Sequence, residues 1–565
     1  MPKDRTCRSS RPRKRVFGGN QFKKVDGAPT GESTSARQLG IAQSEEIPLY
    51  QSHCYKILDF ITVFTALSDL LVCKECKQRV SFAQSDNRGL GFKILLSCLC
   101  GRRQIYSSTF INNSYEINRR IVFVMRLLGV SREGINLFCS LMDLGKGIGK
   151  NSYYVILRHI YDASKIVFLL LRKKAMKEEQ AENEKKERDL SNLKVSSDSS
   201  WQKHGFSSLY AVSTLVGYYS GKVIDLVIKG SYCQACILWK SKEGTDEYLE
   251  WAEAHENECC INHDCSSGKM EVDSIKEMFA RSEEEFGVKY GNYIGDGDSK
   301  TFNGILDLNP YTDDFTVVVN ECVEHVENRM STQLRNLKER EKLGEKLTDA
   351  LIKRLTTYYG LAVRRNVDSV DDMKKEIMAT YKHLCSTNEN PMHENCPPGV
   401  QSWCKWHVAE ATGATFDHPA PLHPDLQKHL LPLYEDLSKN ELVQRYLGGH
   451  TQNVTESFNS CVWRLAPKHL YCGIQTVEIA AYIAAGLFNE GYFAVLKIMD
   501  TLQLKIGSHC IEYADSYDTA RIQRHGRRDF RSSKEGRATR KEINLQEQQL
   551  YEDEEDLLYG PGIID

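Results

Sequence analysis

The stretch VSSDSSWQKHGF at residues 195–206 and the later stretch YGNYIGDGDSKTF at residues 290–302 decide how this chain folds. Each places an aspartate, Asp198 or Asp296, at the end of a short apolar run, which is the pattern of a buried strand that ends at a polar edge. If the two strands are neighbours, both carboxylates lie at the same edge of one sheet. The sequence therefore predicts a sheet with paired carboxylates.

The sequence around these aspartates predicts the order of the sheet. Short runs bounded by Gly or Ser, the last two rich in β-branched residues, favour three antiparallel strands at residues 193–197, 209–216 and 222–229. A helix at residues 272–286, the strand before Asp296, a further helix, a strand at residues 314–321 and more helices follow. This order predicts an α/β (α+β) protein with a ribonuclease-H-like core.

The core is expected to span residues 192–500, with two insertions inside it. The insertion at residues 232–270 is packed with Cys and His, and the one at residues 322–404 is mostly basic and helical. Such insertions are tolerated because the entropy of closing a loop grows slowly with its length. The other predicted regions are a disordered basic tail at 1–47, a zinc-ribbon-like module at 48–110, a helical region at 111–191 and a basic, then acidic, tail at 501–565.

The helical region contains two patterns. Residues 117–171 have the pattern helix, Gly-containing turn, helix, which is typical of a DNA-binding helix-turn-helix and also of plain helical packing. Residues 172–189 are mostly charged and contain no Pro or Gly, which favours a solvated helix that links two domains.

The composition argues against a membrane-spanning protein and against a secreted one. Of the 565 residues, 41% are hydrophobic and 27% charged, and no apolar run approaches the roughly 18 residues of a membrane span. The N-terminus lacks the apolar region of a secretory signal. Its basic cluster, Arg11, Arg13, Lys14 and Arg15, is typical of a nuclear-localisation signal and also of a solvated tail, and we expect a nuclear protein. The net charge is only −2, so any nucleic-acid surface must be local.

In a reducing compartment, Cys and His at short spacings indicate zinc rather than disulfides, and this chain has 19 cysteines. The predicted ligands of a first zinc site are Cys73, Cys76, Cys98 and Cys100. Those of a second site are Cys233, Cys236, His255 and Cys259, with Cys260, His263 and Cys265 as substitutes. The competing interpretation of both sets is buried free thiols.

A third zinc site is expected where the second insertion begins. Cys322 and His325 follow the last predicted strand, and a tetrahedral site needs four ligands. The candidates are Cys322, His325, His393, Cys396 and Cys404. Such a site would fix the insertion to the core and support the carboxylates. The alternative is a core cysteine and a capping histidine.

Glu456 supplies a third carboxylate. It lies near the start of a predicted helix, TQNVTESFNSCVWRL at residues 451–465, whose apolar face contains Phe458, Val462 and Leu465. Hard cations such as Mg²⁺ or Mn²⁺ prefer carboxylate oxygens, and a pair of them supports phosphodiester cleavage. The predicted catalytic residues of a DDE-type nuclease are therefore Asp198, Asp296 and Glu456, with Asp298 as the alternative to Asp296.

With these residues in this order, the chain resembles the Mutator-like (MULE-type) DNA transposases of animal DNA transposons, which belong to the DDE superfamily. The resemblance runs from about residue 51 to the end, through SSDSSWQKHGFSS, YIGDGDSKTF, NECVEHVENRM, HENCPPGVQSWCKW and GGHTQNVTESFN. Two positions depart from the family pattern: Ser199-Ser200 replaces Gly-Thr, and one residue rather than two separates Cys98 from Cys100. The first departure bears on the backbone after Asp198, because Gly permits angles that Ser does not.

The resemblance implies that Asp198, Asp296 and Glu456 form the catalytic triad, and that Cys322 with His325 is the cysteine–histidine signature of the family. It also implies an enzyme that cuts DNA at transposon terminal inverted repeats and joins the ends to target DNA, as a homo-oligomer on DNA in the nucleus. Its cofactors would be Mg²⁺ or Mn²⁺ at the carboxylates and structural Zn²⁺.

A DNA transposase is therefore the first hypothesis. A transposase-derived, catalytically inactive, zinc-containing DNA-binding protein is the second, and a protein-interaction scaffold is a third. Basic side chains of the helical insertion are predicted to contact DNA phosphates, although a solvated helix face explains the same charges. These side chains are Arg335, Lys338, Arg340, Lys342, Lys346, Lys353 and Arg354.

Overall fold

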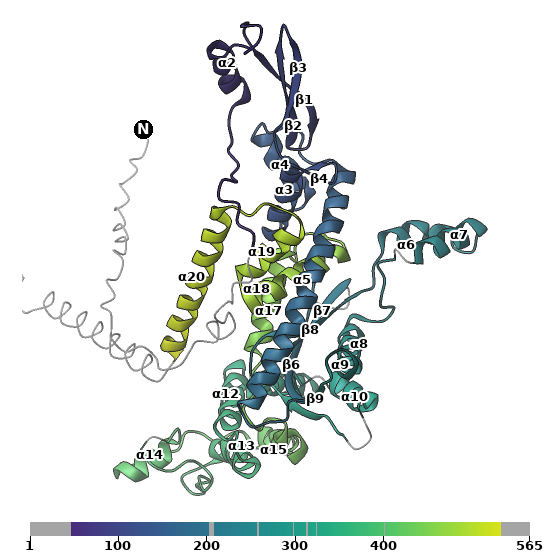
Figure 1. The fold of residues 1–565 in the computed structure, drawn as a ribbon. Helices are drawn as coiled ribbons and strands as arrows, with labels where there is room; N and C mark the ends of the chain where they lie inside the picture. The colour runs from purple at the N-terminus through teal and green to yellow at the C-terminus, as the bar shows by residue number, and fades with distance from the viewer. Residues whose placement is uncertain are drawn as a thin grey trace, which may run out of the picture. The chain divides into compact units, whose positions relative to one another are not determined.

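The structure is a computed structural model that describes residues 47–202, 208–256, 259–297, 299–311, 315–323, 325–400 and 402–532. Residues Gln38–Ala520 form one compact unit, and Figure 1 labels most of its elements. Of the second unit, Met1–Arg37 with Arg521–Asp565, only residues 521–532 are described. The predicted nuclear-localisation cluster and residues 533–565 of the predicted C-terminal tail lie outside the described residues.

A five-stranded sheet carries the predicted carboxylate edge. Its strands are β6 (Asn192–Trp201), β7 (Tyr210–Gly217), β8 (Val223–Gly230), β9 (Lys289–Gly295) and β10 (Val318–Glu321). Their order is β10-β9-β6-β7-β8, so β6 is the central strand. The pairs β6–β7 and β7–β8 are antiparallel, whereas β6–β9 and β9–β10 are parallel. The predicted strands and their order along the chain are confirmed.

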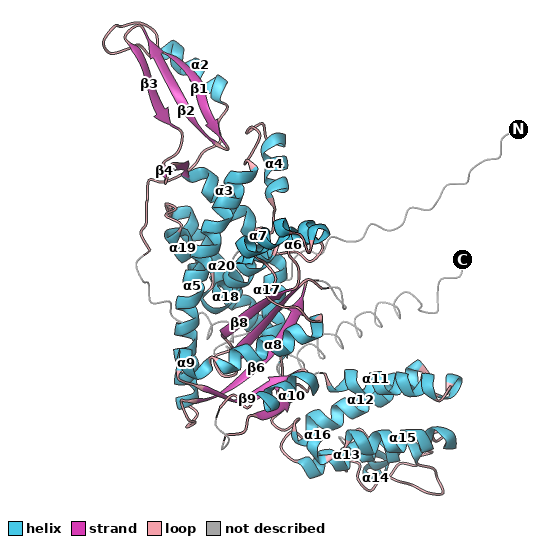
Figure 2. Ribbon diagram, turned by 90° about the vertical axis from the view of Figure 1, so that its right-hand side faces the viewer, coloured by secondary structure: helices cyan, strands magenta, loops and turns pink. Residues whose placement is uncertain are grey.

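Helices cover both faces of this sheet, as the magenta strands and cyan helices of Figure 2 show. One apolar cluster joins the sheet to α8 (Ser267–Ala280), α9 (Ser282–Phe286) and α10 (Ser299–Leu308). The other joins it to α17 (Asn453–Leu465), α18 (Ile474–Glu490) and α19 (Tyr492–Thr501). Successive side chains of a strand point to opposite faces, which is why Val223 of β8 belongs to one cluster and Ile224 to the other.

Residues 172–184 are helical, as predicted for residues 172–189, but they do not form a separate solvated linker. Residues 150–184 form one continuous helix, α5 (Lys150–Glu184), preceded by α3 (Glu116–Leu127) and α4 (Arg132–Leu141). In α5, Arg172 and Glu179 are buried. Glu179 accepts hydrogen bonds from the backbone N–H groups of Tyr219 and Ser220, at 3.1 and 2.7 Å. These charged side chains can lie inside the protein because each one meets a partner there.

The two predicted insertions are folded segments. The first contains α6 (Gln234–Trp239), a 3₁₀ turn (Lys240–Lys242) and α7 (Asp246–His255). The second contains α11 (Val326–Arg340), a 3₁₀ turn (Gly344–Lys346), α12 (Asp349–Arg365), α13 (Val370–Cys385), α14 (Lys405–Thr412), α15 (Pro424–Leu437) and α16 (Asn440–Gln444). It extends past the predicted end at residue 404, because α15 and α16 share one apolar cluster with α11, α12 and α13.

The two ends of the second insertion meet. The N–H of Glu321 donates to the carbonyl of Arg445 at 2.9 Å, and the N–H of Val323 donates to the carbonyl of His450 at 2.9 Å. The Arg445 guanidinium also pairs with the Glu321 carboxylate at 3.2 Å. The insertion therefore leaves the core and returns to it at one place.

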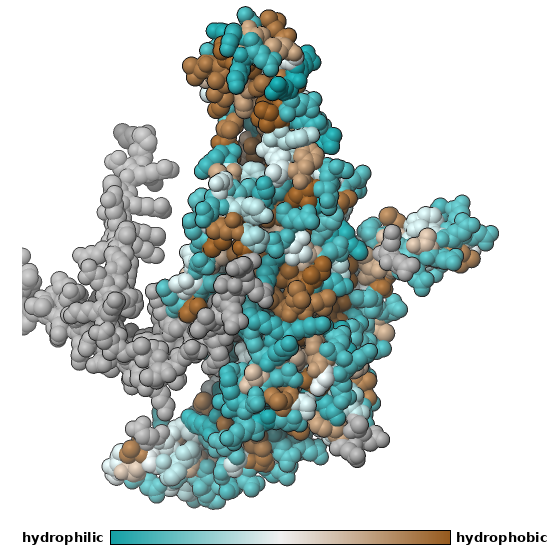
Figure 3. Space-filling model, viewed as in Figure 1, coloured by the Kyte–Doolittle hydropathy of each residue, from teal (hydrophilic) through white to brown (hydrophobic). Residues whose placement is uncertain are grey.

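The remaining elements lie at the two ends of the chain. Near the start they are α2 (Phe60–Leu70), a sheet of β1 (Ser81–Arg88), β2 (Gly91–Cys98) and β3 (Gly101–Tyr106), and a small hairpin of β4 (Phe110–Ile111) and β5 (Ser114–Tyr115). Apolar side chains such as Ile61 and Leu70 of α2 are more than three-quarters exposed, and brown residues mark this region in Figure 3. Residues 508–532, within the predicted tail, form α20 (Ser508–Ser532). None of the described helices is long and apolar enough to cross a bilayer.

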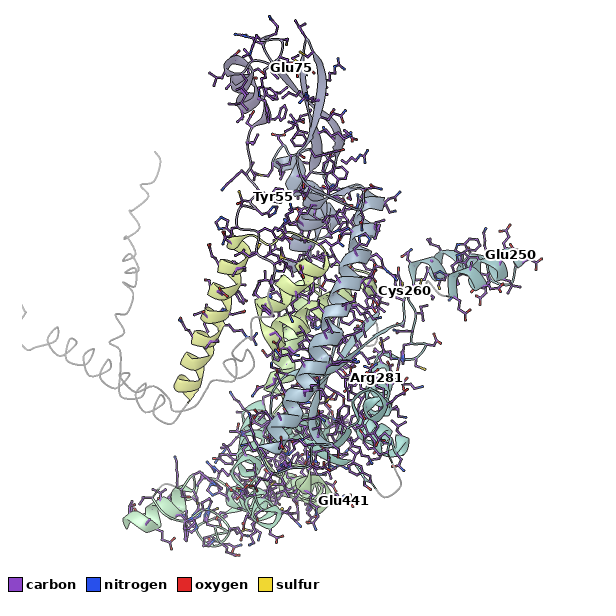
Figure 4. The ribbon with its side chains drawn as sticks, in the orientation of Figure 1. Tyr55, Glu75, Glu250, Cys260, Arg281 and Glu441 are labelled. Carbon is purple, nitrogen blue, oxygen red and sulfur yellow. The ribbon has the colours of Figure 1, made fainter. Side chains whose placement is uncertain are left out.

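A buried charge cluster tests this packing. Asp225 of β8 is fully buried and pairs with Arg172 at 2.8 Å and with Arg281, labelled in Figure 4, at 2.7 Å. We expect Asp225→Ala to lower the free energy of unfolding by about 3 kcal/mol, because two arginines lose their buried counter-charge. Chemical denaturation measures this change.

The control is Asp162→Ala, which removes an exposed pair with Arg158 at 3.5 Å. We expect a change within about 0.5 kcal/mol for that variant. Equal effects of the two substitutions would contradict the packing described for α5, α8 and β8.

Candidate functional site

Asp198 lies on the central strand, β6. Beyond it, β6 stays paired with β7 as far as Trp201, opposite Ala211, and neither Ser199 nor Ser200 has a positive φ. Both serines have partners, since Ser199 Oγ lies 2.7 Å from Ser213 Oγ and Ser200 Oγ accepts a 2.7 Å hydrogen bond from Trp463 Nε1. The backbone after Asp198 is therefore regular strand, and it does not require the glycine of the family pattern.

One face of α17 lies against the part of β6 that carries Asp198. Gln452, the residue before the helix, donates a hydrogen bond from its side-chain amide to the Ser197 carbonyl. Asn459 Nδ2 donates to Asp198 Oδ2 at 2.7 Å. Glu456 lies three residues before Asn459, so the two side chains share a face of the helix. The predicted apolar residues Phe458, Val462 and Leu465 are buried.

Asp296 directly follows β9, the parallel neighbour of β6. The next residue, Gly297, has φ +87°, and a Cβ there would lie 2.5 Å from Arg329 Nη2, so only glycine fits without rearrangement. Arg329 donates to the Gly297 carbonyl at 3.2 Å and pairs with Glu321 at 2.7 Å. Glu321 is 3% exposed. The buried ion pair between Arg329 and Glu321 thus holds the turn after Asp296. The alternative candidate, Asp298, lies outside the described residues.

The charges of Asp296 and Glu456 act on Asp198. Burial, then the charge of Asp296, raises the pKa of Asp198 to about 6, and the charge of Glu456 adds to the rise. The hydrogen bond from Asn459 acts in the opposite direction on that pKa. A divalent cation would offset this concentration of negative charge, so the donor set fits Mg²⁺ or Mn²⁺. The three carboxylates do not form a group whose oxygens all lie within 4.8 Å, as is expected for repelling charges.

The predicted zinc role of Cys322 and His325 is wrong. Both belong to the carboxylate region, because the Cys322 N–H donates to the Gly295 carbonyl at 3.0 Å and His325 Nε2 lies 3.6 Å from Glu456 Oε1. They lie between β10 and α11, and neither belongs to the group of ligand atoms that contains His393, Cys396 and Cys404. The cysteine–histidine signature therefore lies beside the carboxylates.

The third group instead includes a histidine that the sequence did not single out, His383 of α13. Together with His393, Cys396 and Cys404 it forms a set whose ligand atoms all lie within 4.8 Å of one another. His383 Nδ1 lies 3.2 Å from His393 Nδ1 and 3.6 Å from Cys404 Sγ. Ligands of a tetrahedral zinc are about 3.3–3.8 Å apart, so the set has the dimensions of a zinc site.

The first two groups have the predicted members. Cys73, Cys76, Cys98 and Cys100 form one, beside the knuckle residue Glu75 that Figure 4 labels, and Cys233, Cys236, His255 and Cys259 form the other. Cys73 Sγ lies 3.9 Å from Cys100 Sγ, so the short spacing of the second Cys pair still closes the group. None of the substitutes Cys260, His263 and Cys265 joins the second group. His263 instead faces Asp273 at 3.6 Å.

Each group contains a thiol that ionises readily. Backbone N–H groups of Cys76 and Glu75 lower the pKa of Cys73 to about 6. Burial opposes ionisation of Cys233, but backbone hydrogen bonds from Cys260 and Cys236 lower its pKa to about 6. A hydrogen bond from the Cys396 thiol lowers the pKa of Cys404 to about 3. Because thiolates are the form that binds metal, the three groups could each hold a structural metal such as zinc.

The seven basic residues predicted to contact DNA lie on α11, α12 and the turn between them. Three pair with acids: Lys338 with Asp349, Arg340 with Glu341, and Lys346 with Asp425, at 3.2, 2.9 and 2.6 Å. The other four form no ion pair with a described acidic side chain, and all four are exposed: Arg335, Lys342, Lys353 and Arg354. The surface is thus partly neutralised.

Residues 54–404 match the family model of the Mutator-like transposase. The chain belongs to the Mutator-like transposase family. The match includes Asp198, Asp296 and all three metal groups, whereas Glu456 follows its last residue. None of the curated proteins and none of the solved structures in the comparison matches the chain.

Several residues that support the site in this family member were missed by the sequence analysis. Asn459 was signalled by its spacing from Glu456 on one helix face, and Glu321 by its place at the start of the quoted stretch ECVEHV. Arg329 carried no signal, since an arginine on a basic helix is usually solvated. His383 was hidden in an amphipathic helix, where a lone histidine has no ligand spacing to reveal it.

Metal analysis tests the three Cys/His groups. We expect about three zinc ions per chain, one for each group. His383→Ala should lower the content to about two, because that variant removes one of four ligands. The double variant Cys322→Ser with His325→Ala should keep three, and a drop to two in that variant would restore the ligand set first predicted.

Denaturation against pH tests the charge on Asp198. Its pKa is raised to about 6 in the folded protein, so the ionised carboxylate disfavours folding. We expect Asp198→Asn to stabilise the metal-free protein by about 1 kcal/mol at pH 7. The gain should be full above about pH 6 and vanish below about pH 4, where the carboxyl is protonated in both states.

With added Mn²⁺, the wild-type protein should become more stable than Asp198→Asn, because only the wild-type carboxylate binds the cation. Asp162→Asn, at an exposed position, is the control and should show neither effect. A stability difference that does not vary with pH would count against the raised pKa.

Proposed function

We propose that this Mutator-like family member is a DNA transposase that cleaves DNA at transposon ends and transfers the strand, with Mg²⁺ or Mn²⁺ as cofactor. The observation that carries the proposal is the set of three carboxylates around Asp198. They come from the central strand, from the end of its parallel neighbour and from a helix packed on that strand. Burial, together with the charges of Asp296 and Glu456, raises the pKa of Asp198.

The fold supports this proposal. In the order β8-β7-β6-β9-β10, three antiparallel strands are followed by two parallel ones, which is the arrangement expected of a ribonuclease-H-like nuclease. In sequence, β6 is the first strand of this sheet and β9 is the fourth. Asp198 lies on β6 and Asp296 directly follows β9, which is the arrangement expected of a DDE triad. The second insertion lies between the fifth strand and the helix that carries Glu456.

The proposed chemistry has two steps at phosphorus. Water attacks the phosphodiester at the transposon end and releases a 3′-hydroxyl, and this hydroxyl then attacks a phosphodiester of target DNA. When bound, the metal ions would neutralise charge on the phosphodiester and acidify the attacking water. Asp198, Asp296 and Glu456 would hold them. Asn459 donates a hydrogen bond to Oδ2 of Asp198 and so helps to fix the orientation of this carboxylate.

His325 has a place in this proposal. Its ring lies 3.6 Å from Glu456, so it can orient that carboxylate, which is half-exposed at the start of α17. Arg329 and Glu321 contribute indirectly, because their ion pair holds the turn that positions Asp296.

Further parts of the proposal concern partners and location. The exposed basic residues Arg335, Lys342, Lys353 and Arg354 would contact DNA phosphates, with the salt dependence that such contacts bring. Structural zinc would occupy the three Cys/His groups. We further propose that the protein acts in the nucleus, as a homo-oligomer assembled on DNA.

A cleavage assay tests the function. The substrate is a duplex carrying the terminal inverted repeat that flanks the coding sequence, incubated with purified protein and Mg²⁺ or Mn²⁺. We expect the wild-type protein to nick the end, and Asp198→Asn, Asp296→Asn and Glu456→Gln each to reduce the rate by more than about 100-fold, because each removes a metal ligand.

Asp162→Asn is the control and should cleave normally. Unchanged cleavage by any of the three variants would refute the assigned triad. Specific binding of the end by a wild-type protein that neither cleaves it nor binds Mn²⁺ would favour the alternative, a catalytically inactive DNA-binding protein derived from a transposase.

A further inference from the structure

The segment after α17 runs back along the end of β6, close to Asp198. Gln202, which follows β6, donates from its side-chain amide to the Leu470 carbonyl at 3.2 Å and to Cys472 Sγ at 3.4 Å. Trp463, near the end of α17, donates to Ser200 Oγ at 2.7 Å. These contacts fix the segment along the end of β6, just beyond Asp198.

This segment presents one cation, Lys468. Its Nζ lies 5.1 Å from the centroid of the Trp463 ring, and the side chain is partly buried. Burial lowers the pKa of Lys468, and the charge of Asp198 acts in the opposite direction, which places the ammonium within electrostatic reach of that carboxylate. The ammonium nevertheless forms no ion pair within 4 Å with a described acidic side chain, so its charge is held near the site without being neutralised.

A half-buried ammonium without an ion-pair partner is costly unless an anion approaches it. Here the ring of Trp463 supports the ammonium, and Pro467 restricts the backbone just before it. Both features reduce the entropy lost when the side chain is held in one position for a ligand. The arrangement fits an oxygen of a phosphate group, for which lysine is a compact point-charge partner.

We propose that Lys468 contacts a phosphodiester oxygen of the DNA strand that enters the carboxylate site. This inference rests on the proposed function and names a residue that recognises its substrate. The carboxylates repel a phosphate until cations neutralise them, and Lys468 supplies a fixed positive charge on the side of Asp198 where β6 ends. The same charge stabilises the negative charge on the non-bridging phosphate oxygens during in-line attack.

The contact differs from those proposed for α11 and α12. Lys468 belongs to the core, beside Ser200 and Trp463, whereas the basic residues of the insertion lie on exposed helix surfaces. Lys468 should therefore affect the phosphate at the reaction centre, and the insertion residues should affect affinity for DNA in general.

The first measurement is a double-mutant cycle between the lysine and the phosphate charge. Binding of the terminal-repeat duplex is measured in Ca²⁺, with a normal phosphodiester or a neutral methylphosphonate at the cleavage position. We expect the methylphosphonate to weaken binding by the wild-type protein about tenfold and to have little effect on Lys468→Gln, because the charge it removes has lost its partner.

The second measurement is single-turnover cleavage at saturating protein. Lys468→Gln should slow cleavage by about 10- to 100-fold, and Lys468→Arg, which keeps the charge, should stay within about threefold of the wild-type rate. The matched control is Lys497→Gln, since the Lys497 ammonium also lies 5.1 Å from a ring centroid, that of Phe493 on α19. We expect wild-type behaviour from this control in both measurements.

The outcomes separate this inference from the proposed function. Wild-type cleavage without coupling between Lys468 and the phosphate charge would overturn the lysine contact and leave the transposase function standing. Coupling in a wild-type protein that does not cleave would overturn the function and keep the contact. Equal losses for Lys468→Gln and Lys468→Arg would indicate a structural role of the side chain and would also overturn the inference.

Discussion

The packing of α17 on β6 is the interaction on which the rest of the site depends. Three hydrogen bonds from Gln452, Asn459 and Trp463 reach Ser197, Asp198 and Ser200, so the helix is matched to the strand residue by residue. The match brings Glu456 to Asp198 across 258 positions of sequence (456 minus 198). It also fixes the start of the segment that carries Lys468. Gathering like charges is unfavourable, and the apolar cluster behind α17 and α18 offsets that cost.

Much of this fold could be predicted because its strands and helices follow from short, local sequence patterns. The strands were visible as short apolar runs. Asp198, Asp296 and Glu456 were singled out by their position next to such a run or near a helix start, although β6 continues past Asp198 to Trp201. The first two Cys/His groups were also visible, since Cys-x-x-Cys knuckles are local. The predictions that failed concerned which side chains contact each other in the folded protein. A charged segment such as residues 172–189 was expected in solvent, but the charges of Arg172 and Glu179 have partners in Asp225 and in the β7–β8 turn.

The third Cys/His group failed for a related reason. Cys322 and His325 have ligand chemistry and a plausible spacing, yet β10 places them at the carboxylates, and His383 takes the position expected for them. Spacing along the chain cannot distinguish these cases, because the separation in space depends on where α11, α12 and α13 run. Arg329 was missed because an ion pair between a strand end and the following helix leaves no periodic trace in the sequence.

The second insertion is closed at its base. Two backbone hydrogen bonds and the pair between Glu321 and Arg445 join the points where the chain leaves and re-enters the core. The helices and the Cys/His group between those points are held by their own apolar cluster and ligand set, separately from the contacts at the base. The length of the insertion is therefore uncoupled from the geometry of the core, because closing a longer loop between two fixed points costs little additional entropy.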